Sequence, residues 1–220
     1  LNINLGFTKE YLKDLLNELV QKLDDDELFV YWQATRGGNG LRSHNYDKEQ
    51  KANLWITICP EKITDKDREY KLTSMEDTRF CNIKTLNLIP SVVAYQHAKE
   101  NNCDETVFHR GDIVTECAHS NVHIIKDKKF ITHPADEYIL PGIARAHLLK
   151  ACKALNIEVE ERPFTVDELI NADEVIVSSS GDLCIRATEF EGKAVGKKDS
   201  DTFNRLKEYI YQEWLECTKK

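Results

Sequence analysis

The spacing of apolar and polar positions divides the first quarter of the chain into a helix and two strands. Leucine and valine recur at helical spacing over residues 8–23, which predicts an amphipathic helix with Thr8 as its N-cap. Aromatic and β-branched residues predict strands at 28–35 and 54–59. Glycines at three of positions 37–40 predict a loop after the first strand, because glycine weakens a regular element.

Short strands and helices alternate irregularly through the rest of the chain. The pattern predicts strands at 105–109, 113–115, 121–126, 129–132, 157–161, 174–178 and 183–190. It predicts helices at 91–99, 141–155 and 202–217, and a short helix that opens with a capping box at 165–168. Because strict strand–helix–strand repetition is missing, the predicted fold class is α+β.

A densely charged stretch at 60–70 separates these two regions and is typical of a solvated connection. We therefore predict an N-terminal α/β domain at 1–60, a linker at 61–70 and a larger domain at 71–220. The chain begins at Leu1 rather than at a methionine, and its first residues alternate as in a strand. The first domain is therefore expected to lack an N-terminal segment.

Composition narrows the classes of function. The 220 residues carry a formal net charge of −8, which argues against a broad nucleic-acid-binding surface. No apolar stretch approaches the roughly 18 residues of a membrane span. Because seven scattered cysteines form no CxxC pair, reduced thiols in a cytoplasmic protein are expected. They are Cys59, Cys81, Cys103, Cys117, Cys152, Cys184 and Cys217.

Two ionisable residues stand out, although the sequence contains no dinucleotide-binding, Walker A, nucleophile-elbow or HExxH motif. Lys84 lies among apolar neighbours, where burial would lower the pKa of its amine and suit it to Schiff-base chemistry. Glu116 ends a predicted strand among small residues, where a carboxylate can be buried and paired. The alternatives are a surface lysine at a strand end and a solvent-facing glutamate in a turn.

Two segments are candidates for binding anions. Residues 178–181, Ser-Ser-Ser-Gly, follow an apolar strand, and residues 141–144 open a predicted helix whose N–H groups attract anions. Arg42 and His44, two apart in an extended segment, point the same way and could clamp a carboxylate. Ordinary polar loops are the alternative at each place.

A metal site is a weaker hypothesis. Cys117, His119 and His123, with Cys103 and His109 nearby, are residue types that bind metals. Their spacing fits no closed zinc site, so we predict no metal.

Four segments together resemble a known family. They read CNIKTLNLIPSVVAYQ (81–96), HRGDIVTECAHSNV (109–122), HPADEYILPGIAR (133–145) and VIVSSS (175–180). In order and spacing they resemble the class IV, or fold-type IV, aminotransferases that use pyridoxal phosphate. The resemblance implies a small α/β N-terminal domain and a larger, β-barrel-like C-terminal domain with helices.

The resemblance also implies a role for each candidate residue. Lys84 would hold pyridoxal 5′-phosphate covalently and move the proton between the substrate Cα and the cofactor. Glu116 would keep the pyridine nitrogen protonated. The remaining cofactor contacts would be Ser120, Leu140, Ile143, Ala144, Ser179 and Ser180.

Within the family, Arg42-Ser43-His44 resembles the R-x-H segment of the D-amino acid aminotransferases. Arg42 and His44 would then hold the substrate α-carboxylate in the neighbouring subunit of a homodimer. The implied reaction exchanges an amino group between D-amino acids, such as D-alanine or D-glutamate, and 2-oxo acids. The alternatives are an aminodeoxychorismate lyase or another fold-type IV transaminase, and a pyridoxal-phosphate-binding protein without turnover.

The sequence departs from the family pattern in two places. The family has about a further quarter of chain before the position of Leu1, which carries an arginine for the phosphate and a tyrosine near the ring. Cys117-Ala118-His119 stands where small glycine and serine residues are usual. His119 is therefore expected to alter the hydrogen bonding of the cofactor or the substrate preference.

Overall fold

The computed structural model describes residues 3–25, 27–35, 49–77 and 81–218, which form two compact units. The first unit spans Leu1–Ile63 and the second Thr64–Lys220. The division falls inside the stretch predicted as a linker, and Glu69 and Tyr70 at the end of that stretch already belong to a strand.

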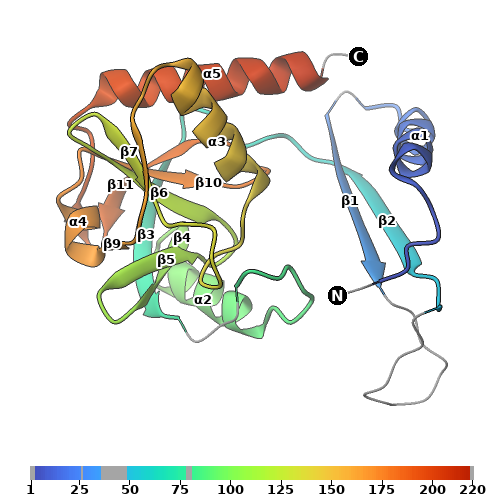
Figure 1. Cartoon of the computed structure of the whole chain (residues 1–220), viewed down its shortest axis with the longest axis horizontal. Helices are drawn as coiled ribbons and strands as arrows, with labels where there is room; N and C mark the ends of the chain where they lie inside the picture. The colour runs from blue at the N-terminus through green and yellow to red at the C-terminus, as the bar shows by residue number, and fades with distance from the viewer. Residues whose placement is uncertain (1–2, 26, 36–48, 78–80, 219–220) are drawn as a thin grey trace. The chain divides into compact units, whose positions relative to one another are not determined.

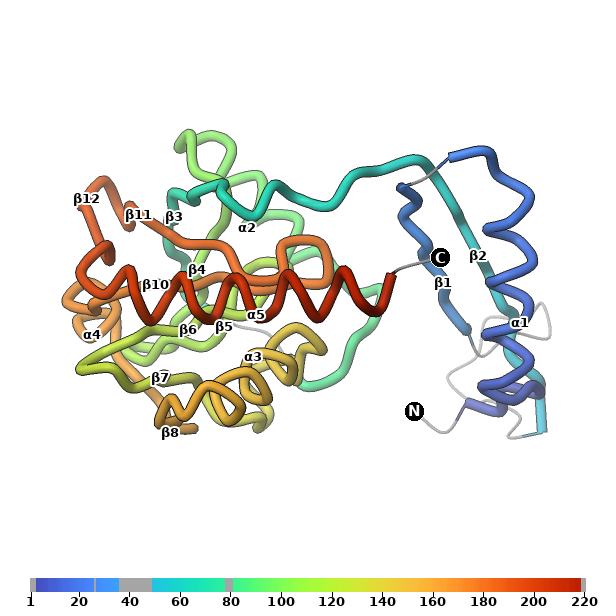
Figure 2. The backbone as a smooth tube through the Cα atoms, turned by 90° about the horizontal axis from the view of Figure 1, so that it is seen from above, coloured from blue at the N-terminus to red at the C-terminus, as the bar shows by residue number. Residues whose placement is uncertain are grey.

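The first unit packs one helix beside a two-stranded sheet (Figures 1 and 2). Helix α1 (Lys9–Val20) follows Thr8, whose hydroxyl accepts a hydrogen bond from the N–H of Tyr11 at 3.1 Å, as an N-cap does. Strands β1 (Leu28–Thr35) and β2 (Asn53–Pro60) pair antiparallel along their whole length. The predicted glycine loop falls outside the described residues.

The second unit is built on a ten-stranded sheet with the order β8-β7-β6-β10-β11-β3-β4-β5-β9, with β12 paired to β11. Its strands are β3 (Glu69–Glu76), β4 (Glu105–Arg110), β5 (Ile113–Cys117), β6 (Asn121–Lys126), β7 (Lys129–Thr132), β8 (Val159–Glu161), β9 (Phe164–Thr165), β10 (Glu174–Ser178), β11 (Ile185–Phe190) and β12 (Lys193–Ala194). Its helices are α2 (Ile89–Glu100), α3 (Ile143–Ala154), α4 (Val166–Ile170) and α5 (Ser200–Thr218). The α+β fold class is thereby confirmed.

The sheet curls into a half barrel. Residues 118–120 alone join β5 to β6, although β10, β11, β3 and β4 lie between these strands in the sheet order. The sheet must therefore bend round so that the end of β5 meets the start of β6. This junction, residues 117–121, carries the candidate residues Cys117, His119 and Ser120.

Strand alternation divides the core into two layers. Val122, Ile124 and their neighbours pack in a cluster on one face of the sheet, whereas Ile125 packs with α3 and α5 on the other. In β10 the same alternation places Val175 and Val177 in the first cluster and Ile176 in the second. By this period of two, Asn121, His123 and Ser178 face the side that carries α3.

Most of the predicted elements are present, with ends shifted by a few residues. Strand β3 is the principal element that the sequence pattern did not reveal. Its sequence, EYKLTSME, continues the charged stretch, but Leu72 is fully buried because β3 pairs parallel with both β11 and β4. A two-residue turn joins β6 to β7, and both of its residues, Asp127 and Lys128, have positive φ, as hairpin turns of this length require.

Candidate functional site

An open pocket of about 1120 Å³ lies in the second unit. Its walls come from four stretches of the chain, which lie within residues 81–96, 116–121, 140–144 and 178–180. These are the four segments that the sequence analysis singled out, and the junction of β5 and β6 lies among them. Folding therefore gathers the candidate residues of the second unit around one space.

Lys84 lines this pocket from the segment that leads into α2. Its side chain is exposed, and so are its apolar neighbours Ile83 and Leu86, at 49% and 63%. Lys84 is therefore exposed to solvent in the second unit by itself. The desolvation that the apolar neighbours suggested is not provided by the described residues of this unit.

Glu116 is buried at the end of β5 and lines the same pocket. Its Oε2 accepts the backbone N–H of Leu140 at 2.7 Å and the side-chain amide of Asn121 at 3.5 Å. These donors stabilise a carboxylate in a fixed orientation. The buried-and-paired interpretation of Glu116 is therefore the one that the structure shows.

Asn121 and Gly142 connect Glu116 to the start of α3. Gly142 lies in the predicted anion-binding segment 141–144, whereas sequence reasoning missed Asn121. The Asn121 amide also donates to the carbonyl of Leu140 at 3.0 Å. A Cβ on Gly142 would lie 2.2 Å from Asn121 Oδ1, so any side chain at position 142 would displace this amide. The Pro-Gly pair before the helix was the available signal, but the asparagine contact depends on the curl of the sheet.

The N-terminus of α3 opens into the pocket. Gly142 is its N-cap and supplies no side-chain hydrogen bond, so the first N–H groups of the helix have no intrahelical acceptor. Ile143 and Ala144 line the pocket here, and Leu140 and Pro141 lead into the helix. This end of a 12-residue helix is suited to bind an anion.

The serine turn after β10 forms another part of the wall. Ser178 hydrogen-bonds through its hydroxyl to Nε2 of His123 at 2.9 Å. Ser179 donates its hydroxyl proton to Asp182 at 2.8 Å and accepts the N–H of Asp182 at 3.1 Å. Asp182 also accepts the Tyr70 hydroxyl at 2.6 Å. The bonds to His123 and Asp182 thus fix Ser178 and Ser179. Ser180 is the exposed residue of the turn and lines the pocket.

Ser120 lies on the junction of β5 and β6 and lines the pocket beside His119. Both side chains bind the fully buried Glu105, the Ser120 hydroxyl at 2.8 Å and His119 Nδ1 at 2.7 Å. The hydrogen bond to Glu105 raises the pKa of His119 above its ordinary value. Sequence reasoning noted His119 but had no signal for its partner 14 residues earlier.

The remaining predictions are placed as follows. Arg42 and His44, the predicted carboxylate clamp, lie outside the described residues. His123 is fully buried between Thr132 and Ser178. In the part of the chain that the structure describes, no three His, Cys, Asp or Glu side chains converge as metal ligands would.

Helices long and apolar enough to cross a membrane do not occur among the described residues.

Comparison with known proteins identifies the family. The family model "Amino-transferase class IV" matches residues 1–190. A D-alanine aminotransferase of Listeria monocytogenes serotype 1/2a (strain 10403S) is 34% identical over 97% of this chain and 76% of its own length.

Two solved structures share the fold at low identity. A T.th. branched-chain amino acid aminotransferase complexed with N-(5′-phosphopyridoxyl)-L-glutamate has a TM-score of 0.81 at 18% identity, over 96% of this chain and 72% of its own. A putative 4-amino-4-deoxychorismate lyase from Legionella pneumophila has a TM-score of 0.77 at 21% identity, over 91% of this chain and 76% of its own. The family match over residues 1–190 and the 34% identity to the Listeria relative show that the chain belongs to the class IV aminotransferases.

Proposed function

We propose that this chain is a pyridoxal-phosphate-dependent aminotransferase that exchanges amino groups between D-amino acids and 2-oxo acids, with D-alanine and D-glutamate among its substrates. One observation carries the proposal: Lys84, Glu116 and the open N-terminus of α3 line the same pocket. An amine, a buried carboxylate and an anion site are the three groups needed to hold a phosphorylated pyridine aldehyde.

The pocket residues fit pyridoxal phosphate. The free N–H groups at Ile143 and Ala144, with the turn at Ser179 and Ser180, suit the phosphate. Since the Ser179 hydroxyl already bonds to Asp182, Ser179 would contribute its backbone N–H. Leu140 would pack against the ring and Ser120 would support the wall behind it.

What pyridoxal phosphate supplies when bound is an electron sink for bond breaking at the substrate Cα. Lys84 would bind the cofactor through its amine and, once displaced by the substrate amine, move the proton between Cα and C4′. Glu116, held by Leu140 and Asn121, would pair with the pyridine nitrogen and keep it protonated.

The preference for D-amino acids is supported by the relatives and by the R-x-H segment. The Listeria protein named above is a D-alanine aminotransferase. Arg42 and His44 would bind the substrate α-carboxylate, the arginine through a bidentate contact.

We further propose a homodimer in which Arg42 and His44 serve the partner's pocket. An apolar face of α2 supports it: Ile89, Val92 and Val93 are spaced i, i+3, i+4 and are 73%, 62% and 54% exposed. Leu86 and Leu88 extend this face, which we call the α2 apolar patch. Seven scattered cysteines without a CxxC pair are typical of a reducing compartment, and we propose the cytoplasm.

An aminodeoxychorismate lyase is the second candidate, because the Legionella protein with that putative assignment shares the fold. A lyase would release pyruvate from aminodeoxychorismate without amino exchange. A binding protein without turnover is the third, and it would take up the cofactor but leave amino acids unchanged.

The test is the visible absorption spectrum of the purified protein with added cofactor, followed by D-alanine or L-alanine in separate samples. We expect an absorption band of the bound cofactor that D-alanine bleaches and L-alanine does not. A band unchanged by both, with pyruvate formed from aminodeoxychorismate, would establish the lyase. Absence of any band would reject pyridoxal phosphate as the cofactor.

A further inference from the structure

A buried carboxylate holds a histidine against the pocket wall. Glu105 lies on β4 with none of its side chain exposed. Its Oε1 accepts the N–H of Thr106 at 2.9 Å, and its Oε2 accepts both the Ser120 hydroxyl and His119 Nδ1. Three donors fix this carboxylate, so it presents a rigid anchor to the imidazole.

The anchor leaves the other ring nitrogen of His119 available. His119 lines the pocket with 49% of its side chain exposed, and Nδ1 is occupied by Glu105. The ring of Tyr95 on α2 packs edge-on against the imidazole, with centroids 5.1 Å apart. Among the described residues, no hydrogen bond to Nε2 is found.

The surroundings favour a charged imidazolium. The hydrogen bond to Glu105 is the largest cause that raises the pKa of His119, and burial opposes it. Asp182 adds to the rise, whereas Lys99 on α2 opposes it. Lys84 and Glu116 line the same pocket. The raised pKa favours the imidazolium form of His119, whose Nε2–H would be a charged donor on a wall shared with Lys84.

We propose that His119 is a specificity-determining residue whose Nε2–H binds the distal carboxylate of dicarboxylic substrates, with Glu105 as its positioning residue. This inference rests on the proposed function, because it assigns the substrate's second carboxylate. The α-carboxylate is left to Arg42 and His44, and the phosphate to the α3 terminus. An imidazolium fixed by a buried anion is a directed donor, which suits a carboxylate and offers nothing to a methyl group.

The test uses two unreactive ligands of equal chain length, glutarate and pentanoate, which differ only in the distal carboxylate. Isothermal titration calorimetry on the cofactor-loaded full-length protein gives the dissociation constant of each. We expect the wild type to prefer glutarate, and His119→Asn to weaken glutarate binding about tenfold or more while pentanoate binding stays within twofold.

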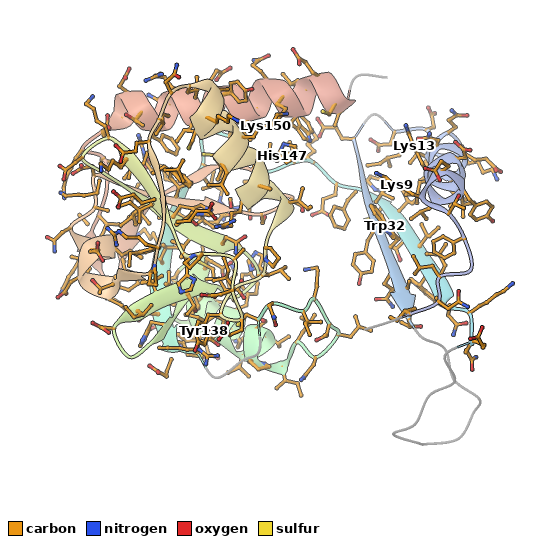
Figure 3. The ribbon with its side chains drawn as sticks, in the orientation of Figure 1. Lys9, Lys13, Trp32, Tyr138, His147 and Lys150 are labelled. Atoms are coloured by element: carbon orange, nitrogen blue, oxygen red, sulfur yellow. The ribbon has the colours of Figure 1, made fainter. Side chains whose placement is uncertain are left out.

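The matched control is His147→Asn (Figure 3). His147 also bonds a carboxylate through Nδ1, Glu213 at 2.7 Å, and is 45% exposed, but it does not line the pocket. This variant should bind both ligands as the wild type does.

Titration over pH distinguishes direct binding from a structural role. The preference for glutarate should fall as pH rises through the raised pKa of His119, because the imidazolium loses its charge. Glu105→Gln removes the anion, so the fall should begin at lower pH. If His119 had only a structural role, its substitution would weaken the binding of both ligands together. The pH midpoint of the glutarate preference would then be the same in Glu105→Gln as in the wild type.

An unchanged glutarate preference in His119→Asn and His119→Gln overturns the inference, as does a wild type without that preference. Failure of the proposed function is a separate result, seen as absent transamination of D-alanine while both binding titrations remain readable. If both His119 variants fail to bind pentanoate, the pH midpoint of the glutarate preference in Glu105→Gln decides. A midpoint at lower pH than in the wild type supports the inference, and an unshifted midpoint overturns it.

Discussion

Lys84 carries the reaction in the proposed mechanism, and the structure leaves its amine in an open pocket. We expect Lys84→Ala to reduce amino transfer from D-alanine by about a thousandfold or more, because the proton between Cα and C4′ loses its carrier. The measurement is pyruvate formation under saturating substrate. Lys150→Ala is the control, since Lys150 is an exposed lysine that bonds Glu213 away from the pocket. Full turnover in Lys84→Ala would contradict the proposed role of Lys84 in proton transfer.

His123 links the stability of the second unit to pH. Burial lowers its pKa to about 3, and it is held neutral between Thr132 and Ser178. Below pH about 6.5 the imidazole of the unfolded chain binds a proton that the folded chain excludes. The free energy of unfolding therefore falls with pH, by up to about 1.4 kcal/mol per pH unit.

We therefore expect His123→Asn to be less stable than the wild type at pH 7, and the difference to narrow as pH falls from 7 to 5. Urea unfolding of both proteins at each pH measures it. A difference that stays constant over this range would show that His123 binds a proton as readily in the folded protein as in the unfolded chain, and would contradict the lowered pKa.

Sequence reasoning finds residue types at this scale and misses their partners. Lys84, Glu116, Ser179 and Ser180 stand out from local context, and all four line the pocket. Glu105 does not, because its partners lie 14 and 15 residues later and approach it only through the antiparallel pairing of β4 with β5, which continues to the bond between Ala118 N–H and the Thr106 carbonyl. Asp182 escapes notice for the same reason, since it bonds Tyr70 across 112 residues.

At the scale of elements, the start of α3 depends on the absence of one carbon atom. A Cβ at position 142 would collide with Asn121 Oδ1, and the same amide is held through its Nδ2, which donates to the Leu140 carbonyl. We expect Gly142→Ala to lower the free energy of unfolding by about 1–3 kcal/mol and to weaken cofactor binding, because Asn121 and the helix end must move.

Gly181→Ala is the matched control. A Cβ there meets nothing within 4 Å, so its free energy of unfolding should equal or slightly exceed that of the wild type. Thermal unfolding and cofactor titration of the two variants provide the comparison. Equal behaviour of both would show that the helix start tolerates displacement.

The elements themselves are largely visible in the sequence, whereas their arrangement is not. Helices α1, α3 and α5 follow from apolar spacing, and β6 and β10 have the predicted bounds. Strand β3 begins inside the predicted linker. The sequence pattern did not reveal it, because the charged residues of this stretch obscure the alternation of Tyr70 and Leu72. Its identity as a strand comes from two parallel neighbours, β11 and β4, that are distant along the chain.

At the scale of the whole molecule, the α2 apolar patch bears on assembly. If it contacts a second copy, Val92→Glu places a charge inside that contact and should shift the protein from dimer to monomer. Sedimentation equilibrium gives the mass. Lys99→Gln makes the same change in net charge on the same helix and should leave the dimer intact. A dimer that survives Val92→Glu would direct attention to other faces.

All the described residues that line the pocket lie between Cys81 and Ser180, inside the second unit. The proposed α-carboxylate clamp, Arg42 and His44, belongs to the first. Selection can therefore act separately on the pocket residues of the second unit and on the proposed clamp of the first. Substitutions before residue 64 can change how the substrate α-carboxylate is held, while the residues proposed to bind the cofactor stay the same. This division would allow substrate binding to change during evolution while the residues proposed for cofactor binding and proton transfer are retained.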